Sequence, residues 1–113
     1  EIELKQHISD RTAWQKMLKH DIDTSINLND LKNKLIDQLS EHNKKFVDKN
    51  DNIIHFNYPH LKFPEKIKSI DLLKESSIDG TLIAIKGQYL LFDDNKVINI
   101  RKHAGFKLSI SVE

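Results

Sequence analysis

The chain has 113 residues, of which 38% are hydrophobic and 31% are charged, and its formal net charge is +1. Zero Cys excludes a disulfide framework, a thiolate zinc site and a thiol nucleophile, and the near-neutral charge excludes a strongly basic arm. The length is enough for one ordinary domain, and neither a signal-peptide pattern nor an apolar run of about 18 residues appears, so we expect a cytoplasmic protein without a membrane partner.

The start of the chain is expected to be helical. Two apolar pairs have the four-residue spacing of a helix face, namely Leu4 with Ile8 and Trp14 with Leu18. Between them, Ser9 or Asp10 can accept backbone N–H bonds as an N-cap and start a second helix near Arg11. We therefore expect two helical pieces with a turn near Ser9, and one continuous helix is the alternative.

The next helix has the clearest pattern in the chain. Its apolar stripe recurs at steps of three or four residues and comprises Leu28, Leu31, Leu35, Leu39, His42 and Phe46. Asn27 or Asn29 can cap its start, and the turn-forming residues 48–52 are expected to end it. The sequence thus predicts one long helix that begins near Leu28.

From Ile53 onward the pattern changes to that of short strands. Alternating or β-branched and aromatic segments predict five or six of them, at residues 53–58, 66–70, 81–86, 88–92, 96–101 and 106–112. Gly87 and the run 93–95 are turn signals between successive strands. In the last segment, alternation of apolar with polar residues predicts one buried face.

These elements predict an α+β fold. Residues 1–52 form the helical part, and residues 53–113 form a small antiparallel β meander or barrel on which the helices pack. The expected core comprises Leu4, Ile8, Trp14, Leu18, Leu31, Leu35, Leu39, Phe46, Leu82, Leu90, Ile98, Ile100, Leu108 and Ile110.

Sequence motifs give little support for catalysis. No phosphate-binding glycine loop and no nucleophile elbow occur, and the six His lack the spacing of a metal site, so a structural or surface role is expected for each. The predicted strands instead carry polar and cationic residues that could contact nucleic acid, namely Lys86, Gln88, Tyr89, Asn99, Arg101 and Lys102. The simpler alternative is that these charges only solvate the outer face of the sheet.

Several segments in the same order resemble one bacterial protein family. They are residues 8–18, Tyr58–Pro59, residues 63–69, 80–92 and 97–102, and Gly105–Phe106. Together they are similar to the uncharacterised domain-of-unknown-function family numbered twenty-seven ninety-seven. The departures are small: Ala84 and Ala13 stand where that family usually has Gly and Asn, and Asp94-Asn95-Lys96 replaces a tighter Gly turn.

This resemblance implies that the chain is the C-terminal half of a longer bacterial protein. The N-terminal half of such proteins looks like a GIY-YIG nuclease module, and Glu1 falls where a metal-binding Glu of that module is expected. A carboxylate is a suitable Mg²⁺ ligand. The resemblance therefore implies a divalent metal in the full-length protein and no cofactor in the present chain.

Three functions from different classes are left open by the sequence. The first is a non-catalytic module that binds or positions nucleic acid. The second is part of a metal-dependent nuclease of GIY-YIG type. The third is a structural or protein-interaction domain without chemistry.

Overall fold

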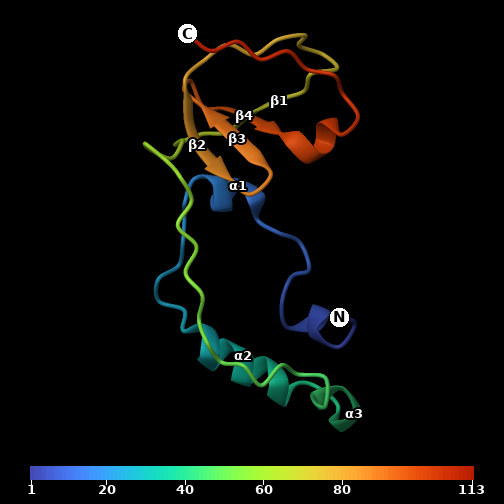
Figure 1. Cartoon of the computed structure of the whole chain (residues 1–113). Helices are drawn as coiled ribbons and strands as arrows, with labels where there is room; N and C mark the ends of the chain where they lie inside the picture. The colour runs from blue at the N-terminus through green and yellow to red at the C-terminus, as the bar shows by residue number, and fades with distance from the viewer. The chain divides into compact units, whose positions relative to one another are not determined.

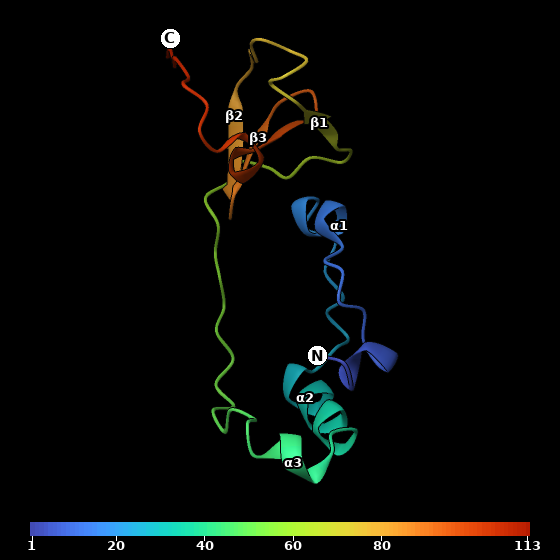
Figure 2. The same cartoon turned by 90° about the vertical axis from the view of Figure 1, so that its right-hand side faces the viewer.

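A computed structural model describes residues 1–113, which divide into two compact units (Figures 1 and 2). Unit 1 comprises Glu1–Trp14 and Asp21–Phe56, and unit 2 comprises Gln15–His20 and Asn57–Glu113. None of the helices has the length and apolar composition that crossing a bilayer requires.

The start of the chain forms two helical pieces, as expected. A 3₁₀ helix, η1 (Leu4–Gln6), is followed by a turn and then by α1 (Trp14–Leu18). In the turn, the N–H of Arg11 donates to Oγ of Ser9 over 3.2 Å. The prediction of two pieces rather than one continuous helix is therefore confirmed, but the second helix begins at Trp14 and not near Arg11.

The predicted long helix is interrupted. Asn27 caps the start of α2 (Leu28–Asp37) by accepting the N–H of Asp30 over 3.1 Å, as expected. The chain leaves the helix after Asp37, however, and begins again in α3 (Glu41–Lys44). The expectation of one continuous helix to Phe46 is thus wrong.

A distant carboxylate explains this interruption. Glu3 accepts three hydrogen bonds at the start of α3, from the backbone N–H of Ser40 (3.0 Å), its hydroxyl (2.8 Å) and the amide of Asn43 (2.9 Å). The first of these bonds satisfies a backbone N–H that the start of a helix leaves without an intrahelical partner, and the other two come from side chains. All three bonds lower the pKa of Glu3, with the bond from the Ser40 backbone as the largest cause.

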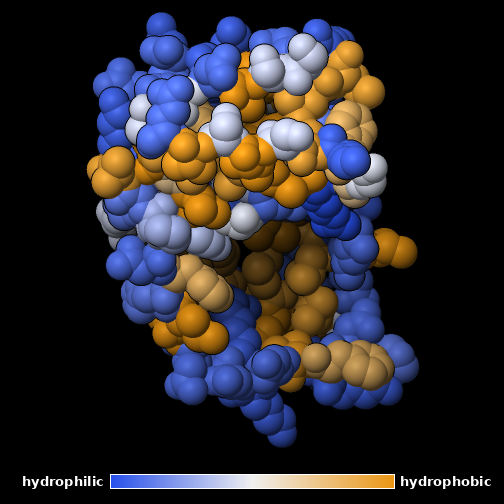
Figure 3. All heavy atoms as spheres, turned by 45° about the horizontal axis from the view of Figure 1, so that its top comes forward, coloured by the Kyte–Doolittle hydropathy of each residue, from blue (hydrophilic) through white to orange (hydrophobic).

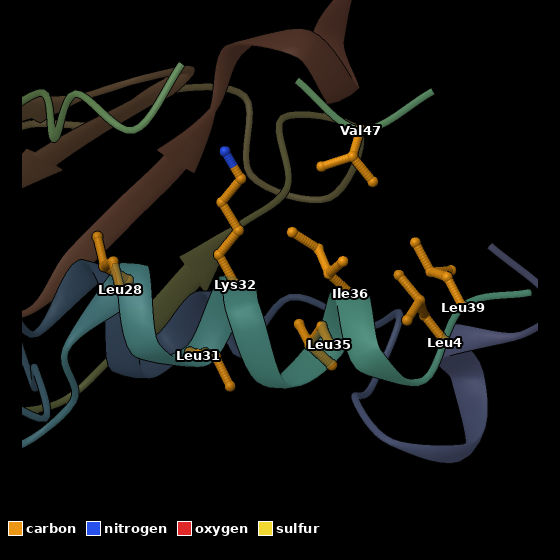
Figure 4. Close-up of a pocket in the computed structure, with 8 residues that line it drawn as sticks. All are labelled: Leu4, Leu28, Leu31, Lys32, Leu35, Ile36, Leu39 and Val47. Atoms are coloured by element: carbon orange, nitrogen blue, oxygen red, sulfur yellow. The ribbon is translucent and has the colours of Figure 1, made fainter. Parts of the chain in front are cut away.

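Unit 1 has a shallow apolar groove along α2 (Figure 4). It is lined by Leu4, Leu28, Leu31, Lys32, Leu35, Ile36, Leu39 and Val47. No residue of unit 1 is fully buried, so the leucine stripe stays half-open to solvent. The loop after α3 is held against α2 by Lys32, whose ammonium donates to the carbonyls of Asp48 (2.5 Å) and Asn50 (3.0 Å).

Unit 2 is built on a four-stranded sheet. Its strands are β1 (Lys68–Ile70), β2 (Leu82–Lys86), β3 (Tyr89–Phe92) and β4 (Lys96–Asn99), in the order β1-β4-β3-β2. β2, β3 and β4 form an antiparallel meander, whereas β1 pairs with β4 in parallel. The α+β class is confirmed. The prediction of a barrel is wrong, because β1 and β2 remain at opposite edges of an open sheet.

Two tight turns fix the meander. Gly87 lies between β2 and β3 with φ of 57°, a conformation that glycine adopts at little cost. Between β3 and β4, Asp94 and Asn95 both have positive φ, 53° and 61°, as a two-residue hairpin turn requires. The predicted turn signals are confirmed at both positions.

Two predicted strands do not form. Residues 53–58 and 106–112 have no strand assignment, and β4 ends at Asn99 rather than at Arg101. The side chain of Asn99 accepts the N–H of Lys102 and starts a 3₁₀ helix, η2 (Ile100–His103). Because β1 takes the second edge of β4, residues 106–112 cannot continue the meander beside β4, and they form no ladder with any other strand.

The core lies entirely in unit 2. Its fully or nearly fully buried apolar side chains are Leu18, Ile70, Ile83, Ala84, Leu91, Val97 and Ile98. Of the expected core, only Leu18 and Ile98 belong to this group. The others are half-buried or exposed, with Phe46, Leu108 and Ile110 the clearest errors, since Ile110 is 87% exposed. Figure 3 shows such apolar side chains at the surface of the part that carries the sheet.

Candidate nucleic-acid interface

Three of the residues predicted to contact nucleic acid form one row across the end of the sheet. Lys86 of β2 is the register partner of Tyr89 of β3, which in turn is the partner of Asn99 of β4. Directly paired residues of an antiparallel sheet place their side chains on the same face. The fold therefore places Lys86, Tyr89 and Asn99, three of the predicted contact residues, next to one another.

The exposed members of the predicted set lie beside this row. The carbonyl of Gln88 accepts the N–H of Ile100 over 2.9 Å, which brings the β2–β3 turn against the start of η2. Gln88, Arg101 and Lys102 are all exposed. We call Gln88, Tyr89, Asn99, Arg101 and Lys102 the sheet-end group.

Asn99 and Lys102 of the sheet-end group already have intramolecular partners. The side chain of Asn99 caps η2, and the ammonium of Lys102 lies 3.1 Å from a carboxylate oxygen of Asp71. The N–H of Leu73 and then Lys102 lower the pKa of Asp71. The side chain of Lys102 is nevertheless 57% exposed, so its remaining N–H donors can reach solvent or a ligand.

Lys86 occupies a different environment from the rest of its row. It is only 7% exposed, and no carboxylate lies within ion-pair distance. Its ammonium donates to the carbonyl of Met17 at the end of α1 (2.6 Å) and to Nδ1 of His20 (3.2 Å). Burial lowers the pKa of Lys86, because the charged form loses hydration.

Aromatic rings surround this buried ammonium. Its nitrogen lies 5.0 Å from the ring centroid of Phe63 and 5.7 Å from that of Tyr58. At such distances the negative faces of the rings stabilise the cation in place of a carboxylate. Lys86 is therefore held as an interior group of unit 2 and is not an exposed phosphate contact.

Phe63 is also the centre of a three-ring stack. His20 lies parallel to it at a centroid distance of 4.5 Å and an interplanar angle of 8°, and His60 lies at 4.2 Å and 20°. Two rings at these distances fit only on opposite faces of the phenyl ring. We call His20, Phe63 and His60 the aromatic stack, and both of its end residues are exposed.

Local backbone geometry positions both imidazoles. His20 follows the last turn of α1 with φ of 58°, a left-handed conformation that His adopts more readily than most residues. The ring of His60 is oriented by a 2.7 Å hydrogen bond from its Nδ1 to the carbonyl of Tyr58. Next to it, the backbone of Pro59 and Leu61 pairs with the outer edge of β2.

His103 has a structural role. It is buried, its Nδ1 donates to the carbonyl of Asn99 (2.9 Å) and its Nε2 accepts the N–H of Leu72 (3.0 Å). Both ring nitrogens are thus used to join η2 to the segment after β1. The sequence expectation of a structural or surface role is met by this residue.

Glu1, which the family resemblance suggested as a metal ligand, is exposed. Its carboxylate lies 3.5 Å from the ammonium of Lys5. The chain contains no group of three or more His, Asp or Glu residues placed to hold a metal ion. The role of Glu1 in a longer protein stays a prediction.

Charge is distributed unevenly between the units. Unit 2 contains eleven Lys and Arg against seven Asp and Glu, a formal net charge of +4, whereas unit 1 contains seven against ten, a net charge of −3. The net charge of the whole chain is thus near zero, although unit 2, which carries both the sheet-end group and the aromatic stack, is cationic.

Sequence reasoning did not find the aromatic stack. His20 lies about 40 residues before His60 and Phe63 in the chain, and neither His has a spacing that marks a site. The available signal was the pair of aromatic-proline steps, Tyr58-Pro59 and Phe63-Pro64, which place two rings on short extended backbone.

The family described as "Protein of unknown function (DUF2797)" matches residues 1–108 of the chain. No curated protein and no solved structure matches the chain.

Proposed function

Since the chain belongs to the family of proteins of unknown function DUF2797, we propose from its own geometry that unit 2 binds nucleic acid. The observation that carries this proposal is the sheet-end group on a unit with a formal net charge of +4. Phosphate contacts dominate nucleic-acid affinity, and they need exposed cations and amides rather than a deep pocket.

The exposed side chains of the sheet-end group suit different parts of this task. The guanidinium of Arg101 can donate two parallel hydrogen bonds to one phosphate. The amide of Gln88 can donate to phosphate or sugar oxygens beside it. Lys102 has three donors, so it can bind a phosphate while it keeps Asp71 as a partner.

The proposal is tested by fluorescence polarisation with a labelled oligonucleotide at several salt concentrations. We expect the affinity to fall as salt rises, and Arg101→Ala to reduce the slope of log K against log salt by about 1. Lys49→Ala is the matched control, because Lys49 is an exposed cation of unit 1. Absence of salt-dependent binding would overturn the proposal.

A second candidate is a protein-interaction domain. The observation that favours it is the unpaired segment 106–112, whose alternating side chains Phe106, Leu108, Ile110 and Val112 are all exposed. We expect self-association in sedimentation experiments if this segment is the interface, and loss of it in Ile110→Asp. If nucleic-acid binding is absent and self-association is present, this second function replaces the first.

A further inference from the structure

The aromatic stack has no part in the phosphate contacts described above, yet it offers a second kind of contact. Its three rings are parallel, its ends are exposed imidazoles, and it belongs to the cationic unit. The ring of His60 is fixed by its 2.7 Å bond to the carbonyl of Tyr58, so little side-chain freedom remains to be lost on binding.

Lys86 joins the aromatic stack to the sheet-end group. Its ammonium contacts His20 and lies 5.0 Å from the ring centroid of Phe63, and its backbone is paired with that of Tyr89. Tyr89 is paired in turn with Asn99, after which η2 begins with Arg101 close by. Planar rings and exposed cations thus follow one another across the end of the sheet.

We propose that the aromatic stack is a platform for an unpaired base, so that the nucleic acid bound by unit 2 is single-stranded. This inference rests on the proposed function and specifies its substrate class. Bases inside a duplex already stack on their neighbours, whereas bases of a single strand are free to stack on protein rings, His included. Grooves for single strands combine such rings with cations that follow the phosphates.

Within this platform, His60 is the contact residue and Lys86 is a positioning residue. His60 lies at an exposed end of the stack, next to backbone that is paired with β2. Lys86 is buried and acts through His20 and Phe63, whose rings it holds together. A base would therefore meet the outer face of His60 while Arg101 contacts the phosphates farther along the strand.

The test uses the 113-residue chain with labelled oligo(dT) and oligo(U) of about 12 nucleotides and a mixed-sequence duplex of the same length. All affinities are measured at one salt concentration, because salt alone changes them. The variants are His60→Ala, which removes the ring, and His60→Tyr, which keeps an aromatic ring that can stack. His55→Ala is the control, since His55 is an exposed His of unit 1.

We expect His60→Ala to weaken single-strand binding by about 5- to 150-fold, the effect of losing one stacked base. His60→Tyr should retain binding, and His55→Ala should leave it unchanged. Duplex binding should be weaker and insensitive to His60→Ala. A preference for oligo(U) or for oligo(dT) identifies RNA or DNA as the ligand, and either result supports the platform.

Three results would contradict the proposal of a base-stacking platform. They are equal affinities of His60→Ala and His55→Ala, an equal loss of duplex and single-strand binding in His60→Ala, and a loss in His60→Tyr as large as that in His60→Ala. If binding still depends on salt in those cases, the proposed nucleic-acid function stands without the platform. If none of the oligonucleotides binds in a salt-dependent manner, the platform and the proposed function both fall.

Discussion

The two units of this chain are stabilised in different ways. Unit 2 surrounds a core in which Leu18 and Leu91 are completely buried. Unit 1 has no fully buried residue and is connected instead by charged side chains that cap backbone groups, above all Glu3 at α3 and Lys32 at the loop after α3. Solvent-exposed contacts of this kind contribute much less to stability than apolar burial does.

This difference teaches that a periodic pattern specifies an element more reliably than it specifies burial. The leucine stripe of α2 is the most regular in the sequence, yet it lines an open groove. The less regular strands β3 and β4 supply much of the core. Amphipathicity shows which face is apolar, while the amount of chain available to cover that face decides whether it is buried.

The largest expected effect comes from truncating the core of unit 2. Leu91→Ala should lower the free energy of unfolding by about 2–5 kcal/mol, because it leaves a cavity among fully packed side chains. Leu35→Ala in the groove of unit 1 should cost only about 1 kcal/mol or less. Urea denaturation, monitored by circular dichroism, measures the loss in free energy of unfolding for both variants. Equal losses would contradict the difference in packing between the two units.

A smaller effect is expected from the buried imidazole of unit 2. His103→Leu fills a similar side-chain volume with an apolar group. It leaves the N–H of Leu72 and the carbonyl of Asn99 without their hydrogen-bond partner. We expect a loss of about 1–3 kcal/mol in the same denaturation experiment. The exposed His55→Leu serves as the control, and indistinguishable stabilities of the two variants would show that this network contributes little.

Lys86 provides a test by pH. Burial lowers its pKa in the folded state, so the unfolded state binds more protons between that lowered pKa and the ordinary value of 10.5. The free energy of unfolding attributable to Lys86 should therefore rise with pH in this window, by at most about 1.4 kcal/mol per pH unit. Urea denaturation of the wild type and Lys86→Met at several pH values gives this difference, and a flat difference contradicts the assignment.

The smallest effect is expected in unit 1, where Glu3 caps α3. Its pKa is lowered in the folded state, so its contribution is present above the ordinary pKa of 4.5 and is lost as pH falls through the lowered value. Glu3→Gln should remove this pH dependence and speed hydrogen exchange at the amide of Ser40, measured by NMR. The exposed Glu75→Gln should leave that amide unchanged.

Features that depend on neighbouring residues could be predicted from the sequence. They include the cap at Asn27, the turn at Asp94 and Asn95, and the meander β2-β3-β4. Three long-range features could not be predicted: the break that Glu3 imposes at Ser40, the parallel placement of β1, and the burial of Lys86 under α1. Each depends on a partner that neither spacing nor composition identifies.

The candidate site follows the same rule. Tyr89 and Asn99, which the sequence placed in one candidate site, lie side by side because the hairpin that pairs them is local. His20 and His60 were missed because Phe63 unites them only in the folded chain. Lys86 was named among the contact residues, but its burial became visible only with α1 in place.

The turn at Asn95 has a consequence for the order of folding. Asn95 accepts the N–H of Lys68 through its carbonyl (2.8 Å) and that of Lys66 through its side chain (3.2 Å), so it forms the docking point for β1. That docking point exists only after β3 and β4 have closed their short turn, whereas β1 must return across a much longer stretch of chain. We therefore expect the amide of Leu91 to gain protection before that of Lys68 in pulsed hydrogen exchange during refolding, with β1 as the last strand to join the sheet.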